Sequence, residues 1–283
     1  MKRVIADSGS TKTSWVLLDG PSELCRVRTA GINPVFSSRE DIVALLREKL
    51  LPALPQGVAG DVAEVDFYAA GIVSDESRTF LSDTLRELFP SALCRSESDM
   101  LAAARALFGG GEGIACILGT GSNSCLYDGR SIVKNVRAGG FILGDEGSGA
   151  SLGKALVADF IKGLLPTEIA SDFAGRYGLD YPAIVQKVYK EPYPGRFLAS
   201  FSPFISEYIG HPHIRAIVEG AFSAFFRRNV ASYGRAGLPV GFVGSVASHY
   251  EDILRQVALK EGFECGPILQ EPLDGLIKYH TAL

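Results

Sequence analysis

The stretch VIADSGSTKTSWVLLDG, Val4 to Gly20, decides the fold expected at the start of the chain. An apolar run ends at an aspartate, a turn of small polar residues follows, and a second apolar run leads to an Asp-Gly turn. Two apolar runs joined in this way predict a β-hairpin. The turn has a second interpretation, because small residues let backbone N–H groups approach a phosphate closely. The stretch alone leaves both interpretations open.

This turn supplies candidate phosphate ligands. Backbone N–H groups at Ser8, Gly9 and Ser10 could contact an anion. Hydroxyls at Ser10 and Thr11 add donors, and Lys12 adds a positive charge. The aspartate before them, residue 7, ends the first strand, where its carboxylate could hold Mg²⁺ through water. The competing interpretation is an ordinary hairpin with an Asp-Ser turn.

The same order of elements returns in ACILGTGSNSCLYDG, Ala115 to Gly129. A strand, a turn rich in glycine and hydroxyls, a second strand and an Asp-Gly turn follow one another again. This repetition indicates an internal duplication and two domains of related topology. Three glycines, Gly109 to Gly111, separate the copies and predict a boundary or hinge. The turn Gly119-Thr120-Gly121 has the same two interpretations, hairpin or phosphate site.

Periodicity along the chain predicts an α/β protein. Up to residue 108 the elements are expected in the order βββαβαβα. The second half is mostly helical, with a long helix over 213–234, a buried strand within 240–247 and a terminal helix over 273–283. Ser248 and Glu251 have the spacing of a capping box for another helix.

Composition excludes several classes of protein. The chain has 283 residues, of which 47% are hydrophobic and 21% charged, enough for one large or two medium domains. A net charge of -4 without a basic block argues against a nucleic-acid binder. There is no apolar run of membrane-spanning length and no signal-peptide pattern, and the five cysteines form no CxxC pair. A reduced, cytoplasmic protein is therefore expected.

Two acidic positions are further candidates. Asp99 directly precedes MLAAARALF and is expected to cap that helix, whose N-terminus would keep the carboxylate ionised and able to accept a proton from a hydroxyl. In GGFILGDEGSG, residues 139–149, Asp145 and Glu146 lie among glycines before a helix. They suit a metal or sugar-hydroxyl contact, and the alternative is a helix cap by Asp145 or Ser148.

Taken together and in this order, these stretches resemble the actin-like ATPase superfamily, which includes sugar kinases and heat-shock chaperones. DSGSTKT resembles its first phosphate motif, GTGSN the second, and VGSVA at 243–247 the adenosine motif; taken alone, VGSVA favours a plain strand-to-helix connection over a nucleotide contact. With LGDEGSG as signature, the chain resembles more closely the BadF/BadG/BcrA/BcrD ATPase family. That family joins N-acetylglucosamine kinases with ATPase activators of CoA-linked reductases and dehydratases.

The resemblance implies two RNase-H-like domains with an ATP and substrate cleft between them. Residues 1–110 would form the first domain together with a terminal helix over 272–283, and residues 111–271 the second. ATP and Mg²⁺ are the implied cofactors and a small sugar the implied substrate, with a homodimer as a further expectation.

The resemblance also implies roles for single residues. The position matching Asp99 is the general base, Asn33 contacts the sugar, and Asp145 binds sugar hydroxyls. Thr11 and Thr120 match phosphate-contacting threonines. The full set expected to bind ATP is Ser8, Gly9, Ser10, Thr11, Lys12, Gly119, Thr120, Gly121, Gly244 and Ser245. The set expected to bind substrate is Asn33, Asp99, Ser122, Asn123, Gly140 and Asp145. The metal would be held by Asp7 and Asp145.

Two features separate the expected functions. Many family members carry a Gly-Trp-Gly run before the signature, where this chain has Gly139, Gly140 and Phe141, with Gly139 in place of the tryptophan. The difference bears on the identity of the sugar. The activator branch uses a cysteine-ligated iron–sulfur cluster, whereas Cys116 and Cys125 lie in or beside apolar strands and suit a core. An ATP-dependent kinase for N-acetylglucosamine or a related amino sugar is expected. The alternatives are an ATPase activator of a redox partner and a nucleotide-dependent sugar sensor.

Overall fold

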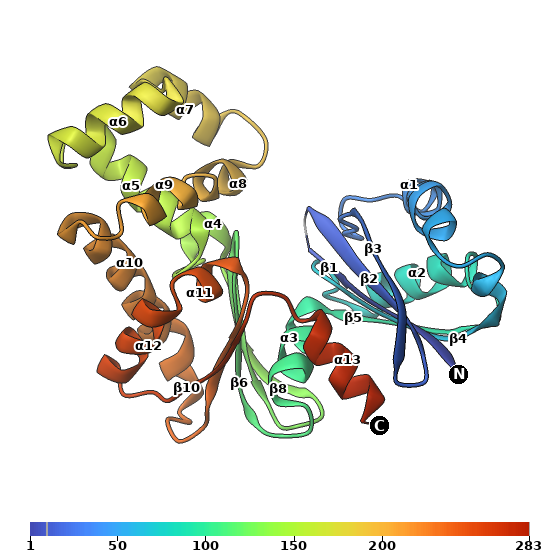
Figure 1. Ribbon diagram of the computed structural model, residues 1–283. Coiled ribbons are helices and arrows are strands. Elements are labelled where there is room, and N and C mark those ends of the chain that lie inside the picture. Colours follow the sequence, from blue (N-terminus) through green and yellow to red (C-terminus); the bar gives the residue numbers. More distant parts are fainter. Residues whose placement is uncertain (10, 283) are drawn as a thin grey trace. The chain divides into compact units, whose positions relative to one another are not determined.

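The computed structural model describes residues 1–9 and 11–282, and the chain forms two compact units (Figure 1). The first unit contains Met1–Gly111, Gly129–Ser131 and Glu271–Leu283. The second contains Glu112–Asp128 and Ile132–Gln270. The chain therefore leaves the first unit, builds the second, and returns to the first.

A five-stranded mixed sheet forms the centre of the first unit. Its strands in spatial order are β3 (Ser22–Ala30), β2 (Lys12–Asp19), β1 (Lys2–Ser8), β4 (Val62–Ala69) and β5 (Leu93–Ser98). Strands β1, β2 and β3 pair antiparallel, while β4 is parallel to β1 and β5 to β4. The stretch from residue 4 to residue 20 is thus a hairpin, as its pattern predicts.

The second unit repeats this sheet. Its strands in spatial order are β8 (Ile132–Val136), β7 (Ser122–Tyr127), β6 (Gly113–Leu118), β9 (Val240–Val243) and β10 (Cys265–Leu269). Strands β6, β7 and β8 pair antiparallel, and β9 and β10 continue the sheet in parallel. Each strand has a counterpart of the same direction in the first sheet. The predicted α/β class with two domains of related topology is confirmed.

Side-chain alternation gives the first sheet two packed faces. Val4 and Ala6 of β1 pack into a core with α1 (Arg39–Leu45) and α2 (Asp75–Arg86), while Ile5 between them faces the opposite core. Helix α1 continues as a π-helical turn, and two 3₁₀ turns follow, at Leu46–Leu50, Leu51–Ala53 and Val58–Asp61.

The opposite face is covered by α3 (Asp99–Phe108) and α13 (Leu273–Thr281), which lie side by side (Figure 1). Gly275 of α13 packs so closely on α3 that a Cβ there would lie 2.5 Å from the carbonyl oxygen of Ala106. Leu276 completes the core around Ile5. The C-terminal helix is therefore an integral layer of the first unit.

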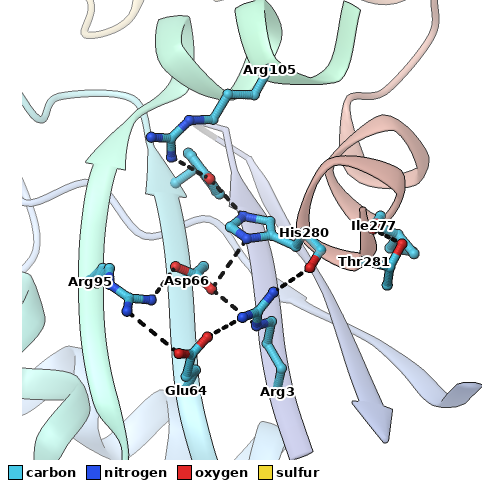
Figure 2. Close-up of polar contacts among 9 residues, drawn as sticks. Arg3, Glu64, Asp66, Arg95, Arg105, Ile277, His280 and Thr281 are labelled. Atoms are coloured by element: carbon cyan, nitrogen blue, oxygen red, sulfur yellow. Dashed lines mark hydrogen bonds and ion pairs between the residues drawn. The ribbon is translucent and has the colours of Figure 1, made fainter. Parts of the chain in front are cut away.

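A partly buried polar cluster fastens the end of α13 to the sheet (Figure 2). The ring of His280 lies with Nε2 2.8 Å from the Tyr68 hydroxyl and Nδ1 3.6 Å from Asp66. Arg3 donates to the carbonyl of His280 at 2.6 Å and pairs with Glu64. Burial lowers the pKa of His280 to about 4, so the ring is neutral at neutral pH.

The second unit has an aromatic core and more helices. Phe173, Phe201 and Phe204 contact one another, and Phe226 packs on Phe242 of β9. The helices are α4 (Gly140–Leu143), α5 (Gly149–Ile161), α6 (Thr167–Tyr177), α7 (Tyr181–Tyr189), α8 (Pro194–Ala199), α9 (Ser202–Glu207), α10 (Pro212–Phe225), α11 (Ser245–His249) and α12 (Glu251–Lys260). Over residues 1–9 and 11–282, no helix has the length and apolar character needed to cross a membrane.

Three local predictions were wrong in detail. The long helix ends as an α-helix at Phe225 and continues as a π-helical and a 3₁₀ turn, Phe226–Val230 and Ala231–Tyr233. Ser248 does not cap α12, because it lies inside α11, which begins directly after the glycine turn. Asp99 is not the cap of α3, because Ser98 takes that place and accepts from the Leu101 N–H at 3.2 Å.

Candidate functional site

The first unit gathers its candidate residues at the carboxyl edge of its parallel strands. Ser8, Ala69 and Ser98 are register partners on β1, β4 and β5. Asp7, the last residue but one of β1, therefore lies at the edge where Asp99 begins α3. In open α/β sheets ligands bind at this edge, because the loops that follow the strands converge there.

Asp7 is half-buried beside other negative charges. Its pKa is raised to about 7, mainly by burial and also by the carboxylates of Asp99 and Glu271, against the opposing effect of Lys12. A bound cation would relieve this repulsion. Among the residues that the structure describes, no three His, Cys, Asp or Glu side chains gather as metal ligands. A single carboxylate such as that of Asp7 still suits Mg²⁺, because this ion is commonly held by one or two carboxylates together with phosphate oxygens and water.

Asp99 is the first residue of α3 and is also half-buried. Burial raises the pKa of its carboxyl above the ordinary value, while hydrogen bonds from the N–H groups of Met100 and Asp99 itself lower it. Burial has the larger effect. A carboxylate with a raised pKa is a better proton acceptor than one in water.

The turn between β1 and β2, called the first turn below, contains both buried and exposed residues. The hydroxyl of Ser8 is buried 2.7 Å from that of Thr13 and accepts from the Ile32 N–H at 2.8 Å. The Gly9 N–H donates within the turn, to the carbonyl of Lys12, at 3.0 Å. The side chain of Ser8 thus holds β1, β2 and the loop after β3 together.

The outer part of this turn is exposed. Thr11 and Lys12 both reach the surface, and the Lys12 ammonium forms an ion pair with Glu271. Ser10, also a predicted phosphate ligand, lies outside the described residues. Of the described residues in this turn, Thr11 and Lys12 have side chains that can meet a ligand without disturbing the core.

Asn33 lies in the loop after β3, against the loop after β4. Its Oδ1 accepts from the Val35 N–H at 2.9 Å. Gly71, at φ +88°, fits closely against it, since a Cβ there would lie 2.2 Å from that oxygen. Glycine is required at 71 both by this backbone conformation and by the contact. The arrangement fixes the Asn33 amide at the same edge as Asp7.

In the second unit the corresponding edge is built from glycine and hydroxyl residues. Ile117, Val243 and Leu269 are register partners on β6, β9 and β10. Gly244 follows at φ +129°, where a Cβ would lie 2.2 Å from the Leu118 carbonyl oxygen. Its N–H donates to Leu269 at 2.9 Å. The VGSVA turn is therefore pressed against the end of β6.

Asp145 brings the signature loop to the second turn. Its Oδ1 accepts from the Ser122 N–H at 3.2 Å, and a Cβ on Gly121 would lie 3.1 Å from Oδ2. The backbone of Asp145 is left-handed, with φ of 56°. Burial, with a smaller contribution from Glu146, raises the pKa of its carboxyl. Ser148, not Asp145, caps α5, and its Oγ accepts from the Ser151 N–H at 3.1 Å.

Helix α5 supports this turn directly. The N–H groups of Gly149 and Ala150 donate to the carbonyls of Gly119 and Thr120 at 2.8 and 3.0 Å. Glu146 is held separately, 2.7 Å from Arg228. The N-terminal residues of α5 therefore fix the backbone of the turn between β6 and β7.

Two other predicted positions have mainly structural surroundings. The Asn123 Oδ1 accepts from Asn135 of β8 at 2.9 Å. Gly139 and Gly140 have left-handed backbones, with φ of 77° and 69°. A Cβ on Gly139 would lie 3.2 Å from the Gly144 nitrogen, so a tryptophan on this backbone would be strained.

A cavity of about 760 Å³ opens beside this edge, within the second unit. Gly119, Thr120 and Ser245, all predicted nucleotide ligands, line it. Other lining residues were not predicted: Gly149, Ala199, Ser202, Pro203, Ser206, Glu207, Val246, Ser248, His249, Tyr250 and Gln270. Its volume suits a small-molecule ligand.

Two contacts join the walls of this cavity. His249 of α11 is hydrogen-bonded to Ser206 of α9, and the Tyr250 hydroxyl donates to the Ser202 carbonyl at 3.3 Å. No local sequence signal identifies the α9 residues, because they reach the cavity only through helix packing.

Two mixed sheets of matching topology, each with its candidate residues at the carboxyl edge, define the fold class of actin-like ATPases, with two RNase-H-like domains. The family model described as "BadF/BadG/BcrA/BcrD ATPase family" matches residues 6–162. The chain belongs to this family. Compared by sequence with curated proteins, it has no match.

Solved structures extend the similarity to the whole chain. A candidate N-acetylglucosamine kinase from Porphyromonas gingivalis is 45% identical, with a TM-score of 0.94 over 99% of this chain and 98% of that one. One from Chromobacterium violaceum is 18% identical, with a TM-score of 0.74 over 98% of both chains. A ROK hexokinase from Thermus thermophilus shares the fold at 17% identity and a TM-score of 0.56, over 99% and 97%.

Proposed function

We propose that this protein is an ATP-dependent sugar kinase that transfers a phosphoryl group to a hydroxyl of N-acetylglucosamine or a related amino sugar. One observation carries the proposal: Asp99, a half-buried carboxyl with a raised pKa, begins α3 at the sheet edge where the first turn ends β1. Membership of an ATPase family and the 45% identity to the Porphyromonas gingivalis protein support this class of reaction.

In this proposal Asp99 is the general base. It accepts the proton of the attacking sugar hydroxyl, the role that an aspartate has in other kinases. Its raised pKa favours proton transfer to the carboxylate. A base must be ionised to accept a proton, so activity falls as the pH falls through that pKa. Asn33, fixed at the same edge, contacts the sugar through its amide.

Candidate nucleotide ligands occur in each unit. The nucleoside occupies the cavity beside Gly244 and Ser245, whose walls present hydroxyl and imidazole groups. In the second unit, the backbone from Gly119 to Gly121 and the side chain of Thr120 are the proposed phosphate ligands. In the first unit, they are the side chains of Thr11 and Lys12. Ser8 and Gly9 would shape the turn around the phosphates, since the Gly9 N–H already donates to the Lys12 carbonyl and the Ser8 hydroxyl is buried. Donors fixed before the substrate arrives stabilise developing charge without reorganising.

Mg²⁺ would be held by Asp7, with nucleotide phosphates and water as the other ligands, and would neutralise phosphate charge. Asp145 has a dual assignment, as a sugar-hydroxyl contact and as a second carboxylate near the metal. Ser122 and Gly140 are proposed neighbours of the sugar, as is Asn123. Ser122 and Asp145 are joined by a hydrogen bond, so their contributions are coupled.

A coupled assay of ADP release over a panel of sugars tests the proposal. N-acetylglucosamine, N-acetylmannosamine, glucosamine and glucose are compared at equal concentration with Mg²⁺ and ATP. The proposal predicts release that depends on an amino sugar, with a phosphorylated sugar identified by mass spectrometry. Hydrolysis independent of sugar would favour an activating ATPase, and ATP binding without any product would favour a sensor. The homodimer and the cytoplasmic location stay predictions.

A further inference from the structure

Glu271 belongs to none of the sequence motifs described above, yet it lies at the carboxyl edge of the first sheet. It is the residue at which the chain returns to the first unit, immediately before α13. Its carboxylate forms an ion pair with the ammonium of Lys12, which begins β2 at the end of the first turn. The two residues are 259 positions apart in the chain. The pair therefore exists only because the chain returns to the first sheet.

The two partners differ in freedom. The Glu271 side chain is 29% exposed, whereas that of Lys12 is 52% exposed. A lysine side chain carries roughly 2 kcal/mol of rotamer entropy, which it loses when a ligand fixes its ammonium. A carboxylate that is itself largely buried limits the positions of the ammonium before any ligand binds. Part of that entropy is then lost when the chain folds, so less is lost when the ligand binds.

Lys12 can still bind an anion while it is paired with Glu271. Arg28 lies 3.7 Å from the same carboxylate oxygen, so Glu271 faces two cations and the three groups together carry a net positive charge. The ammonium has three N–H donors, and one carboxylate oxygen takes one of them. Two donors remain for an incoming anion. The carboxylate can therefore orient Lys12 while Lys12 contacts a phosphate.

We propose that Glu271 is a positioning residue for the nucleotide: it holds the Lys12 ammonium at the first turn, where that ammonium contacts a phosphate of ATP. Glu271 itself contacts neither substrate. The inference rests on the proposed function, because it requires that nucleotide phosphates reach this turn.

The test is titration calorimetry of the full chain with ATP and, separately, with adenosine. Glu271→Gln keeps the shape of the side chain and removes its charge. The Kd for ATP rises about five-fold, which is about 1 kcal/mol. The Kd for adenosine, which has no phosphate, does not change. In the kinase assay the KM for ATP rises by the same factor while kcat stays within about two-fold. Glu271→Asp recovers part of the ATP affinity.

Two further variants separate positioning from a purely structural role. Glu87→Gln breaks a comparable surface pair in the same unit, Arg39–Glu87 at 2.7 Å, and leaves both affinities unchanged. The double variant Lys12→Glu with Glu271→Lys restores an ion pair of reversed polarity. It recovers the unfolding temperature but not the affinity for ATP. If the pair only tethered the turn and Lys12 contacted no phosphate, both would recover.

The inference is overturned if Glu271→Gln binds ATP as tightly as the parent or more tightly, or if adenosine binding weakens equally. It is also overturned if the parent binds ATP no more tightly than adenosine, because Lys12 then contacts no phosphate. If the parent binds ATP tightly but phosphorylates no sugar, the proposed kinase function is refuted. The Kd values of the parent and of Glu271→Gln for ATP and adenosine then still decide this inference.

Discussion

The carboxyl edges of the two sheets have the same topology and different chemistry. The first edge carries ionisable groups, Asp7, Asp99 and Lys12, whose charges influence one another. The second is built mainly from glycines and hydroxyls, such as Gly119 and Ser245, beside a cavity, with Asp145 as its carboxylate. The duplicated sheet sets where loops converge, and the loop residues set what each edge can bind.

The layers beneath the edges also differ. The first sheet is held partly by the polar cluster around His280, whereas the second packs through aromatic contacts, such as that of Phe242 in β9 with Phe226. Aromatic packing is insensitive to pH, while a buried histidine is not. The comparison therefore predicts that the two units respond differently to single substitutions and to acid.

Asp99→Asn should have the largest effect. If the first edge supplies the base, kcat falls by roughly 10²- to 10⁴-fold, because an amide cannot accept the hydroxyl proton. ATP binding persists, since the nucleotide depends mainly on other groups. The measurement is coupled ADP release with N-acetylglucosamine. Ser98→Ala is the control: it removes the helix cap, lowering stability by about 1 kcal/mol, and keeps the carboxyl. Asp99→Asn activity near the parent's would refute the role.

Gly244→Ala tests the second edge. The added Cβ would lie 2.2 Å from the Leu118 carbonyl oxygen at a φ that alanine rarely adopts. The free energy of unfolding in urea should fall by about 3 kcal/mol, and stabilisation by ATP should be lost. Gly237→Ala is matched, because nothing lies within 4 Å of a Cβ there. Equal behaviour of the two variants would contradict the close packing of the VGSVA turn.

His280 tests the polar layer. Its pKa is about 4 in the folded state against an ordinary 6.5, so the neutral ring favours folding. That stability is present above about pH 6.5 and is lost as the pH falls toward 4, up to roughly 3 kcal/mol. Urea unfolding measured at intervals from about pH 7 to about pH 4.5 should show a smaller decline for His280→Gln than for the parent.

Thr281→Ala is the control for that experiment, since its hydroxyl bonds only to carbonyls of its own helix among the contacts described. It should keep the parent's pH dependence. If His280→Gln declines as steeply as the parent, the acid sensitivity of the first unit arises from other groups.

Asp7 should give the smallest effect, on the metal. With a pKa of about 7, the carboxyl is mostly ionised at about pH 8 and mostly protonated at about pH 6. The apparent affinity for Mg²⁺ should therefore weaken roughly ten-fold over that range. Asp7→Asn should bind Mg²⁺ more weakly and lose this pH dependence, and Asp19→Asn should keep it. The same pH dependence in Asp7→Asn would exclude Asp7 as the titrating ligand.

The sequence allowed most of the scaffold to be predicted, for reasons visible in single residues. Alternation in β1 places Val4 and Ala6 on one face and Ile5 on the other, and hydrophobic period identifies such strands. Helix starts were harder. Ser98 and Asp99 are both good caps in adjacent positions, and only the backbone decides between them.

The candidate site was predictable where it lies in a turn that follows a strand. Gly119 and Gly244 belong to that class, since glycine-rich turns leave a local signal. The cavity wall at Ser202 and Ser206, and Glu271 opposite Lys12, leave none. Their places depend on helix packing and on a contact across 259 residues, which no local pattern encodes.

The return of α13 to the first sheet has a consequence for synthesis. Leu273 and Leu276 belong to the core that contains Ile5 and Val16, so that core stays incomplete until they leave the ribosome. Every residue of the second unit emerges earlier. Domains usually complete their folding from the N-terminus onward. Here the order is reversed: the unit translated second can close its core while the unit translated first still waits for its last helix.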